Sequence, residues 1–277
     1  MTSRQYAEVI GDPIAQSLSP AIHGFWLEKL GIAADYGRRQ VSRAELKAYL
    51  DSARADEHWR GCNVTMPLKL DALTLADEAS DRALGTGAAN LIVPRSGKLL
   101  AANTDVGGIL AVLTPELMPP ESEVCIIGTG GAARAALVAM RIRNASLALI
   151  TARDLRAGIR LVQDFGFGGT VRDFEDPHNV KTADVIINAT PLGMTGQPAM
   201  PQELLNHIAG SSSHVVVLDL ITSPTETELI RVARALGRRT VTGLNVLVEQ
   251  AAESFKLFFG KDPPRDKDGE LMQKLGE

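Results

Sequence analysis

The stretch Val124-Cys-Ile-Ile-Gly128-Thr-Gly130-Gly131-Ala132-Ala133 decides the fold of this chain. Its first four residues are apolar, which predicts a buried strand, and a helix over residues 132–141 is expected to follow. The glycines between them match G-x-G-x-x-A, a pattern typical of a turn that binds a dinucleotide. Gly128 permits the tight turn, Gly130 lets the backbone approach a pyrophosphate, and Ala133 keeps the helix close to the strand. The alternative is a glycine-rich turn without a ligand.

The chain after this motif continues as alternating strands and helices. Residues 147–151, 184–189 and 215–220 are further apolar runs of strand length, a helix is expected over 226–236, and a last short strand over 240–242. Strands that are apolar on both faces and separated by helices predict a parallel sheet. Residues 106–243 are therefore expected to form a Rossmann-type, doubly wound parallel-sheet domain that binds a dinucleotide.

The first part of the chain predicts a separate α/β domain. Strands are expected over 6–11, 36–41 and 61–65, helices over 21–30, 42–53 and 68–79, and a hairpin over 88–103 that turns at Ser96-Gly97. A long amphipathic helix is expected over 244–259. The predicted domains are thus 1–105, joined by the C-terminal helical segment 244–277, and 106–243, with the boundary in the helix after Asp105.

The composition excludes several classes of protein. The 277 residues include 29 Lys and Arg against 33 Asp and Glu, and this acidic balance argues against a nucleic-acid partner. Cys62 and Cys125 lie in apolar stretches and are expected to be buried thiols, and the five histidines form no metal-ligand spacing with them. No metal site is therefore expected. No apolar run resembles a signal core or a membrane span, so a soluble cytoplasmic protein is expected.

The residues at the end of the second Rossmann strand are expected to select the cofactor. They read Thr151-Ala152-Arg153-Asp154. A carboxylate at this place hydrogen-bonds the ribose hydroxyls of NAD, whereas an arginine accepts the 2′-phosphate of NADP. Asp154 would repel a 2′-phosphate and Arg153 could stack on the adenine, so NAD or NADP is expected, with NAD favoured. The alternative is a solvated charge pair at a helix start.

Polar residues interrupt the apolar stretches of the first domain. Hydroxyls and amides both donate and accept hydrogen bonds, so together they suit a hydroxyl-rich ligand, and one lysine with one carboxylate could exchange a proton with it. Taken singly, Ser19 and Asp105 could instead be helix N-caps, and Lys69 a surface lysine. The set comprises Ser17, Ser19, Asn63, Thr65, Lys69, Asn90, Asn103, Thr104 and Asp105.

Several motifs in a fixed order extend this set over nearly the whole chain, from about Glu8 to Pro264. They are Ser17-Leu-Ser19-Pro20, Asn63-Val-Thr65-Met-Pro67-Leu-Lys69, Gly87-Ala-Ala-Asn90, Asn103-Thr-Asp105, the Gly128 loop, Asn188-Ala-Thr190 with Gly193-Met194, and Gly243 with Gln250. With these motifs the chain resembles the shikimate dehydrogenase family. The resemblance implies a two-domain α/β enzyme that reduces 3-dehydroshikimate to shikimate, a small cyclic hydroxy acid, with a nicotinamide cofactor.

The resemblance also implies roles for individual residues. Lys69 and Asp105 would form the catalytic pair. The expected substrate-binding residues are Ser17, Ser19, Asn63, Thr65, Asn90 and Gln250. The expected cofactor-binding residues are Gly128, Gly130, Gly131, Ala132, Arg153, Asp154, Thr190 and Gly243.

The chain departs from the family pattern where specificity would be set. The family usually has Asn-Arg-Thr where this chain has Ala152-Arg153-Asp154, and a tyrosine where this chain has Thr222. Ala89 and Leu91 flank Asn90, where valine and threonine are common in the family. A divergent member that acts on quinate or an aminoshikimate is therefore an alternative.

Two readings outside this activity also remain. A non-catalytic, NAD(P)-binding regulatory protein would account for Thr222 and the unusual cofactor stretch, but not for the intact Lys69 and Asp105. A dehydrogenase acting on a folate would share the two-domain plan without explaining Ser17 and Ser19. The sequence does not distinguish a monomer from a homodimer.

Overall fold

The computed structural model describes residues 4–276, and the chain divides into two compact units. One unit comprises the chain up to Thr104 and from Gln250 onward, and the other is Asp105–Glu249. Helices α5 (Thr104–Val112) and α11 (Gly243–Phe259) carry the chain between them. The return therefore falls inside α11, at Gln250, and not at residue 244, where the C-terminal segment was expected to begin.

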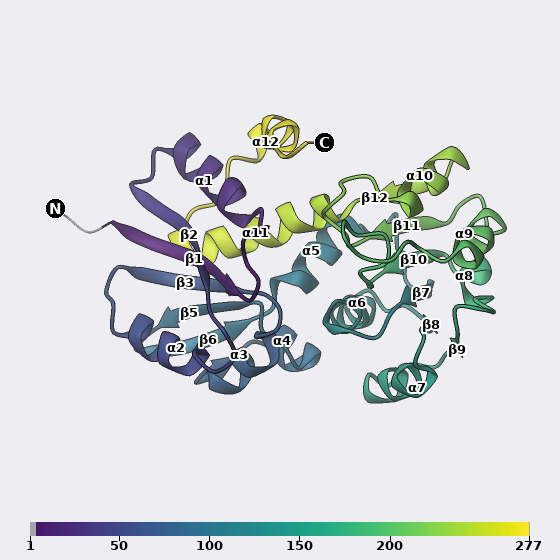
Figure 1. Ribbon diagram of the computed structural model, residues 1–277, viewed down its shortest axis with the longest axis horizontal. Coiled ribbons are helices and arrows are strands. Elements are labelled where there is room, and N and C mark those ends of the chain that lie inside the picture. Colours follow the sequence, from purple (N-terminus) through teal and green to yellow (C-terminus); the bar gives the residue numbers. More distant parts are fainter. Residues whose placement is uncertain (1–3, 277) are drawn as a thin grey trace. The chain divides into compact units, whose positions relative to one another are not determined.

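The first unit is built on a six-stranded mixed sheet, shown in Figure 1. The order is β2-β1-β3-β5-β6-β4; β1 runs parallel to β2 and β3, while β5 is antiparallel to β3 and β6. Strands β5 and β6 form the expected hairpin around Ser96-Gly97. The strands are β1 (Gln5–Gly11), β2 (Ala34–Gln40), β3 (Trp59–Val64), β4 (Glu78–Ala79), β5 (Leu91–Arg95) and β6 (Lys98–Ala102).

Alternation along the strands distributes the helices of the first unit over two faces of this sheet. Ala7 packs with Phe258 of α11, whereas Ile10 and Cys62 pack with Leu50 of α2. Side chains two residues apart share a face of a strand, so β1 presents one face to each helix layer. The helices are α1 (Ser19–Leu30), α2 (Leu46–Arg54), α3 (Lys69–Leu75), α4 (Asp81–Thr86), the 3-10 turn η1 (Arg265–Lys267) and α12 (Asp268–Leu275).

The predicted helix over 68–79 is wrong at its C-terminal end. Helix α3 stops at Leu75, and Glu78–Ala79 forms strand β4 beside β6. The Asp77 backbone N–H donates to the Leu99 carbonyl, and the Asp77 carboxylate accepts from the Leu99 N–H. Pairing with the edge of the sheet thus overrides the local helical pattern. The short helix α4, which follows β4, was not predicted.

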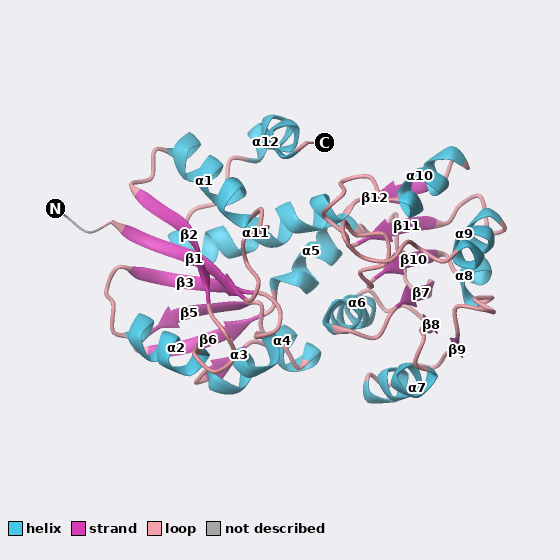
Figure 2. Ribbon diagram, in the orientation of Figure 1, coloured by secondary structure: helices cyan, strands magenta, loops and turns pink. Residues whose placement is uncertain are grey.

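The second unit contains a parallel sheet in the order β12-β11-β10-β7-β8-β9, coloured by secondary structure in Figure 2. The order reverses between β7 and β10, which is the switch point of a Rossmann-type sheet and confirms the predicted fold class. The strands are β7 (Glu123–Ile127), β8 (Leu147–Thr151), β9 (Val171–Arg172), β10 (Val185–Asn188), β11 (Val216–Asp219) and β12 (Arg239–Val241).

Apolar packing on both faces explains why the strands of the second unit read as continuous apolar runs. Val124 and Ile126 pack in a cluster with α6, while Cys125 and Ile127 pack in another with α9 and α10. Cys62 and Cys125 are buried free thiols, as predicted. The helices are α6 (Gly131–Ile142), α7 (Leu155–Asp164), α8 (Asn179–Thr182), α9 (Gln202–Ala209) and α10 (Glu228–Ala235).

No helix within residues 4–276 is both long and apolar enough to cross a bilayer.

A buried histidine lies in the aromatic core of the first unit. The His23 ring is fully buried and stacks on Tyr36, with ring centroids 4.0 Å apart, and Trp26 and Phe255 contact it from other sides. Within the described residues neither ring nitrogen has a hydrogen-bond partner. Burial disfavours the imidazolium and lowers the pKa of His23 from 6.5 to about 3.

His23→Phe should flatten the pH dependence of stability. In the wild type, the folded state binds fewer protons than the unfolded state between pH 6.5 and 3, so stability falls as the pH drops through this window. The loss from pH 7 to pH 5 should be about 2 kcal/mol. Phenylalanine keeps the aromatic packing and does not titrate. Urea unfolding at both pH values measures the difference, with His178→Gln at an exposed site as control. Parallel pH profiles for wild type and His23→Phe would contradict this account.

Candidate active site

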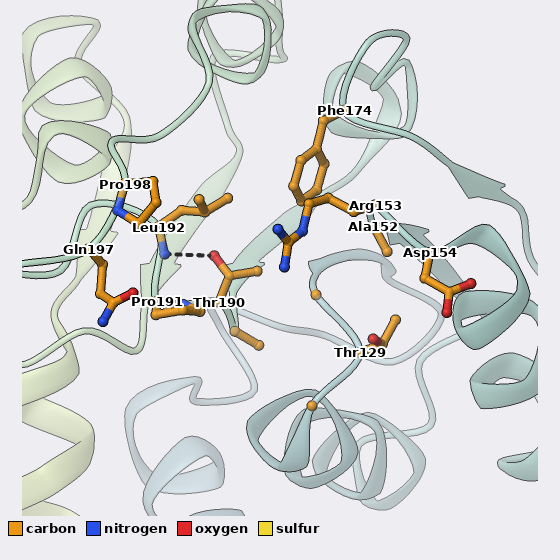
Figure 3. A pocket seen from close by; sticks show the side chains of 13 residues that line it. Thr129, Ala152, Arg153, Asp154, Phe174, Thr190, Pro191, Leu192, Gln197 and Pro198 are labelled. Atoms are coloured by element: carbon orange, nitrogen blue, oxygen red, sulfur yellow. Dashed lines mark hydrogen bonds between the residues drawn. The ribbon is translucent and has the colours of Figure 1, made fainter.

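A cavity of about 350 Å³ lies at the carboxyl ends of β7, β8 and β10, and its lining side chains are shown in Figure 3. This is where ligands bind in open parallel sheets, at the point where the strand order reverses. Its size is within the range of small-molecule sites. It is lined by Gly128, Thr129, Gly130, Ala152, Arg153, Asp154, Phe174, Ala189, Thr190, Pro191, Leu192, Gln197 and Pro198.

The glycine-rich turn leaves the N-terminus of α6 open. Gly128 has φ +112°, and a Cβ there would lie 2.7 Å from Thr190 Cγ2. Gly130 precedes α6, no side chain caps that helix, and its first turn, with Gly131 and Ala132, holds no acidic residue. Because uncapped N–H groups at a helix N-terminus attract anions, this end of α6 fits the pyrophosphate of a dinucleotide.

Arg153 and Asp154 play different parts at the rim of the cavity. The Asp154 carboxylate caps α7 by accepting a hydrogen bond from the Ala157 N–H at 3.0 Å. Figure 3 shows the Arg153 guanidinium beside the Phe174 ring and directed toward Thr190, whereas the Asp154 carboxylate lies on the other side of Ala152, near Thr129. Both side chains line the cavity, and the carboxylate that favoured NAD in the sequence also caps α7 through Oδ1.

A polar network holds the loop after β10 against the cavity. Asn188 Oδ1 accepts from the Thr190 backbone N–H and hydroxyl at 3.0 and 2.7 Å, and the Leu192 N–H donates to the Thr190 hydroxyl. Asn188 Nδ2 donates to Asp219, and burial raises the pKa of that carboxyl. Gly243 lies outside this cavity: it begins α11, where a Cβ would collide with the Ile221 carbonyl.

The predicted polar residues of the first unit lie on loops and at helix starts. Ser19 is the first residue of α1, so the N-cap reading is wrong for it: Leu18 is the cap, and the Ser19 hydroxyl hydrogen-bonds Tyr36. The Ser19 N–H donates to the Ser17 hydroxyl at 3.3 Å. Thr65 follows β3, and its N–H donates to the Ile10 carbonyl.

Lys69 and Asp105 both stand in the first turn of a helix. Lys69 begins α3, and its carbonyl accepts the Ala89 N–H at 2.9 Å, which ties the start of this helix to the residue before Asn90. Asp105 is the second residue of α5 and belongs to the second unit. Its predicted partner Lys69 belongs to the first unit.

Asn90 and Gln250 meet in a buried cluster that the sequence did not predict. Asn90 Nδ2 donates to the Thr104 hydroxyl at 3.0 Å and to Gln250 Oε1 at 3.4 Å, and the Thr104 hydroxyl donates to Gln250 Oε1 at 3.0 Å. Ser254 lies 3.3 Å from the Thr104 hydroxyl. Thr104 belongs to the predicted polar set, whereas Ser254 was missed. Ser254 stands one helical turn after Gln250, a spacing that places two side chains on one helix face.

Among residues 4–276, no three His, Cys, Asp or Glu side chains are grouped as a metal site would require.

Comparison with known proteins extends these observations. Family models described as "Shikimate dehydrogenase substrate binding domain" and "Shikimate 5'-dehydrogenase C-terminal domain" match residues 9–92 and 243–268. A shikimate dehydrogenase (NADP(+)) of Sphingopyxis alaskensis is 42% identical over 98% of this chain and 96% of its own length.

Solved structures of shikimate and quinate dehydrogenases are similar to this chain over nearly its whole length. The shikimate 5-dehydrogenase of Thermus thermophilus in complex with NADP(H) and shikimate is 31% identical, with a TM-score of 0.84 over 98% of this chain and 99% of that one. The quinate dehydrogenase of Corynebacterium glutamicum in complex with NAD is 29% identical, with a TM-score of 0.84 over 98% and 99%.

The Rossmann unit with its open glycine turn and the second α/β unit with its buried polar cluster define a two-domain, nicotinamide-dependent oxidoreductase. Identity and coverage narrow this class: the chain belongs to the shikimate dehydrogenase family. The cofactor is therefore NAD or NADP, and the preference for NAD that the sequence suggested finds no support in these relatives.

Gly128→Ala should destabilise the ligand-free protein, whereas Gly131→Ala should not. Alanine at position 128 would have to adopt φ +112° and place its Cβ 2.7 Å from Thr190, at an expected cost of at least about 2 kcal/mol. A Cβ at Gly131 meets no atom within 4 Å, and helical alanine is favoured over glycine by up to about 1 kcal/mol. Denaturant unfolding without cofactor compares the two. Equal stability of both variants would show that the turn does not need glycine.

Proposed function

We propose that this chain is a shikimate dehydrogenase, which interconverts shikimate and 3-dehydroshikimate by hydride transfer with a nicotinamide cofactor. One observation carries the proposal: a chain with the dinucleotide-binding turn also contains Lys69, Asp105 and the polar set of the first unit, and it matches curated shikimate dehydrogenases over nearly its whole length. In this proposal, residues 1–105 with 244–277 bind the substrate and residues 106–243 bind the cofactor.

The residues around the cavity of the second unit suit a dinucleotide. The N–H groups of Gly130, Gly131 and Ala132 would face the pyrophosphate, and Thr190 would bound the site from the β10 loop. Gly243 lies outside the cavity, and any contact that it makes with the cofactor would come from its backbone. Its close approach to Ile221 leaves room only for a residue without a side chain. When bound, the nicotinamide supplies the hydride chemistry that no side chain of the protein can supply.

Lys69 would manage the proton of the reaction. As the ketone of 3-dehydroshikimate is reduced, its oxygen gains negative charge, and the Lys69 ammonium would donate a proton to that oxygen. In the reverse direction, the neutral amine would accept the proton of the hydroxyl that is being oxidised. The Asp105 carboxylate would orient Lys69 and stabilise its charged form.

The remaining polar residues would recognise the substrate. Ser17 and Ser19 would hydrogen-bond the carboxylate, and Thr65 with the amides of Asn63, Asn90 and Gln250 would bind the ring hydroxyls. Asn63, Asn90 and Gln250 are buried, and each hydrogen-bonds other protein groups, so their amide orientations are set before the substrate arrives. Such preorganisation lowers the entropy cost of binding.

The cofactor in this proposal is NADP rather than NAD. Arg153 reaches into the cavity, where it would pair with a 2′-phosphate, and Asp154 is engaged in capping α7. The curated relatives are named for NADP(+).

Quinate is the second candidate substrate. Thr222 stands where the resemblance places a tyrosine, and a quinate dehydrogenase is among the similar structures. A shorter side chain at this position would leave space for the additional hydroxyl of quinate. Assays with shikimate and quinate, each with NADP and NAD, decide between them, and turnover of neither acid with either cofactor would refute the proposed function.

Lys69→Ala should lower kcat for shikimate oxidation by about 10²- to 10⁴-fold, because a positioned general acid–base contributes this much. The dissociation constant of the cofactor, measured by fluorescence titration, should stay within about two-fold of the wild-type value. Lys98→Ala removes an exposed lysine of the same unit and should leave both quantities unchanged. Wild-type turnover in Lys69→Ala would remove this residue from the mechanism.

Arg153→Ala should raise KM for NADP by about 10- to 100-fold, since a hydrogen bond to a charged group contributes about 1.5–3 kcal/mol. KM for NAD, which has no 2′-phosphate, should change little. Arg156→Ala, at an exposed arginine in the first turn of α7, is the matched control and should behave as the wild type. An equal rise in KM for both cofactors would show that Arg153 does not read the 2′-phosphate.

A further inference from the structure

The hydroxyl of Ser254 is the junction of a hydrogen-bond chain inside the first unit. The side chain of Ser254 is fully buried on α11. Its hydroxyl donates to the Gln250 carbonyl at 3.0 Å, accepts from Asn63 Nδ2 at 2.9 Å, and lies 3.3 Å from the Thr104 hydroxyl. A hydroxyl has one proton, and that of Thr104 goes to Gln250 Oε1. Ser254 therefore shares its own proton between the Gln250 carbonyl and the Thr104 oxygen, and its oxygen accepts from Asn63 Nδ2.

The hydrogen-bond chain continues from Ser254 through Asn63 to Tyr36, next to the start of α1. The Tyr36 hydroxyl donates to Asn63 Oδ1 at 2.6 Å, and the Ser19 hydroxyl hydrogen-bonds Tyr36. Burial raises the pKa of Tyr36 well above its ordinary value, so its hydroxyl remains protonated and can donate. The Tyr36 ring is itself held by the stack with His23.

At its other end, the hydrogen-bond chain sets the orientation of the side-chain amides of Asn90 and Gln250. Asn90 Oδ1 accepts the Thr104 backbone N–H at 2.7 Å, and a backbone N–H can only donate, so Asn90 must turn Nδ2 toward the Thr104 hydroxyl and Gln250. Gln250 uses Oε1 to accept from Thr104 and Asn90, which makes Nε2 the end that can donate to a ligand.

We infer that Tyr36 and Ser254 are positioning residues that couple the two ends of the substrate site through this chain. The inference rests on the proposed function, in which Ser19 binds the substrate carboxylate and Asn90 and Gln250 bind ring hydroxyls. Tyr36, Asn63, Ser254, Thr104, Gln250 and Asn90 form one series of hydrogen-bonded side chains, and Ser19 interacts with the Tyr36 hydroxyl at its start. Neither Tyr36 nor Ser254 contacts the substrate in this account; each acts by holding a side chain that does.

The physical reason for such a chain is the cost of leaving buried polar groups unpaired. Ser254 and Thr104 are fully buried, and Asn63 and Asn90 nearly so, so each arrangement of donors and acceptors that breaks the series leaves an unsatisfied group. A single arrangement therefore has a large advantage. Removal of one hydroxyl would free the neighbouring amides to rotate, and the substrate would have to order them on binding.

Steady-state kinetics of Ser254→Ala and Tyr36→Phe test the inference. Tyr36→Phe removes one hydroxyl and keeps the ring on His23. Each variant should raise KM for shikimate by about ten-fold, with kcat and KM for NADP within about two-fold of wild type, the pattern of lost uniform binding. The double variant should raise KM for shikimate by less than the product of the two single increases, because both substitutions interrupt the same hydrogen-bond chain.

The matched control is Ser122→Ala in the second unit. Ser122 is also a buried serine, and its hydroxyl donates to the Pro119 carbonyl at 2.6 Å. It should lose stability as Ser254→Ala does and keep the wild-type KM for shikimate. If the Ser254 and Tyr36 variants lose stability but retain that KM, or if KM for NADP rises equally, the residues are merely structural and the inference is overturned.

Crystal structures of the same two variants separate this inference from the proposed function. Rotated or disordered Asn90 and Gln250 side chains would support the positioning role even if the wild type turned over neither acid. Unchanged side chains in both variants would overturn it, whichever acid is the substrate. If Ser254→Ala fails to fold, Tyr36→Phe alone decides by the same two measurements.

Discussion

The hydrogen bond between the Thr104 hydroxyl and Gln250 Oε1, 3.0 Å long, joins the two places where the chain leaves and re-enters the first unit. Thr104 opens α5, and Gln250 lies midway along α11. Both side chains are buried, so their polar atoms must pair within the protein. Asn90, which we assign to the substrate, hydrogen-bonds both partners of this bond, and Asp105 follows Thr104 directly.

The aromatic core beneath this cluster gives it a rigid base. His23, Trp26, Tyr36 and Phe255 contact one another from α1, β2 and α11. Tyr36 belongs to both layers, because its ring stacks on His23 while its hydroxyl donates to Asn63. Tyrosine can do both because it has an apolar ring that packs in the core and a hydroxyl that forms hydrogen bonds.

Much of the fold could be predicted from local pattern. The strands of the second unit are apolar on both faces, and the turn at Gly128 needs glycine, because only glycine accepts φ +112° so close to Thr190. Prediction failed where a distant strand changed the local preference. Residues 78–79 read as the end of a helix, but pairing with β6 makes them a strand. The alternative interpretation of Ser19 as a helix cap also failed, because Leu18 occupies the cap position of α1.

The sequence by itself determined the fold class, the dinucleotide turn and the family, because these depend on periodicity and on motifs whose residues are adjacent in the chain. Only the tertiary structure decided which polar groups act together. Asp154 is a helix cap and Arg153 faces the cavity, although the two are neighbours in sequence. Ser254 and Asn63 share a hydrogen bond although they are 191 positions apart in the sequence. Hydrogen bonds depend on distance and direction in space, and those are set by how the sheet and helices pack.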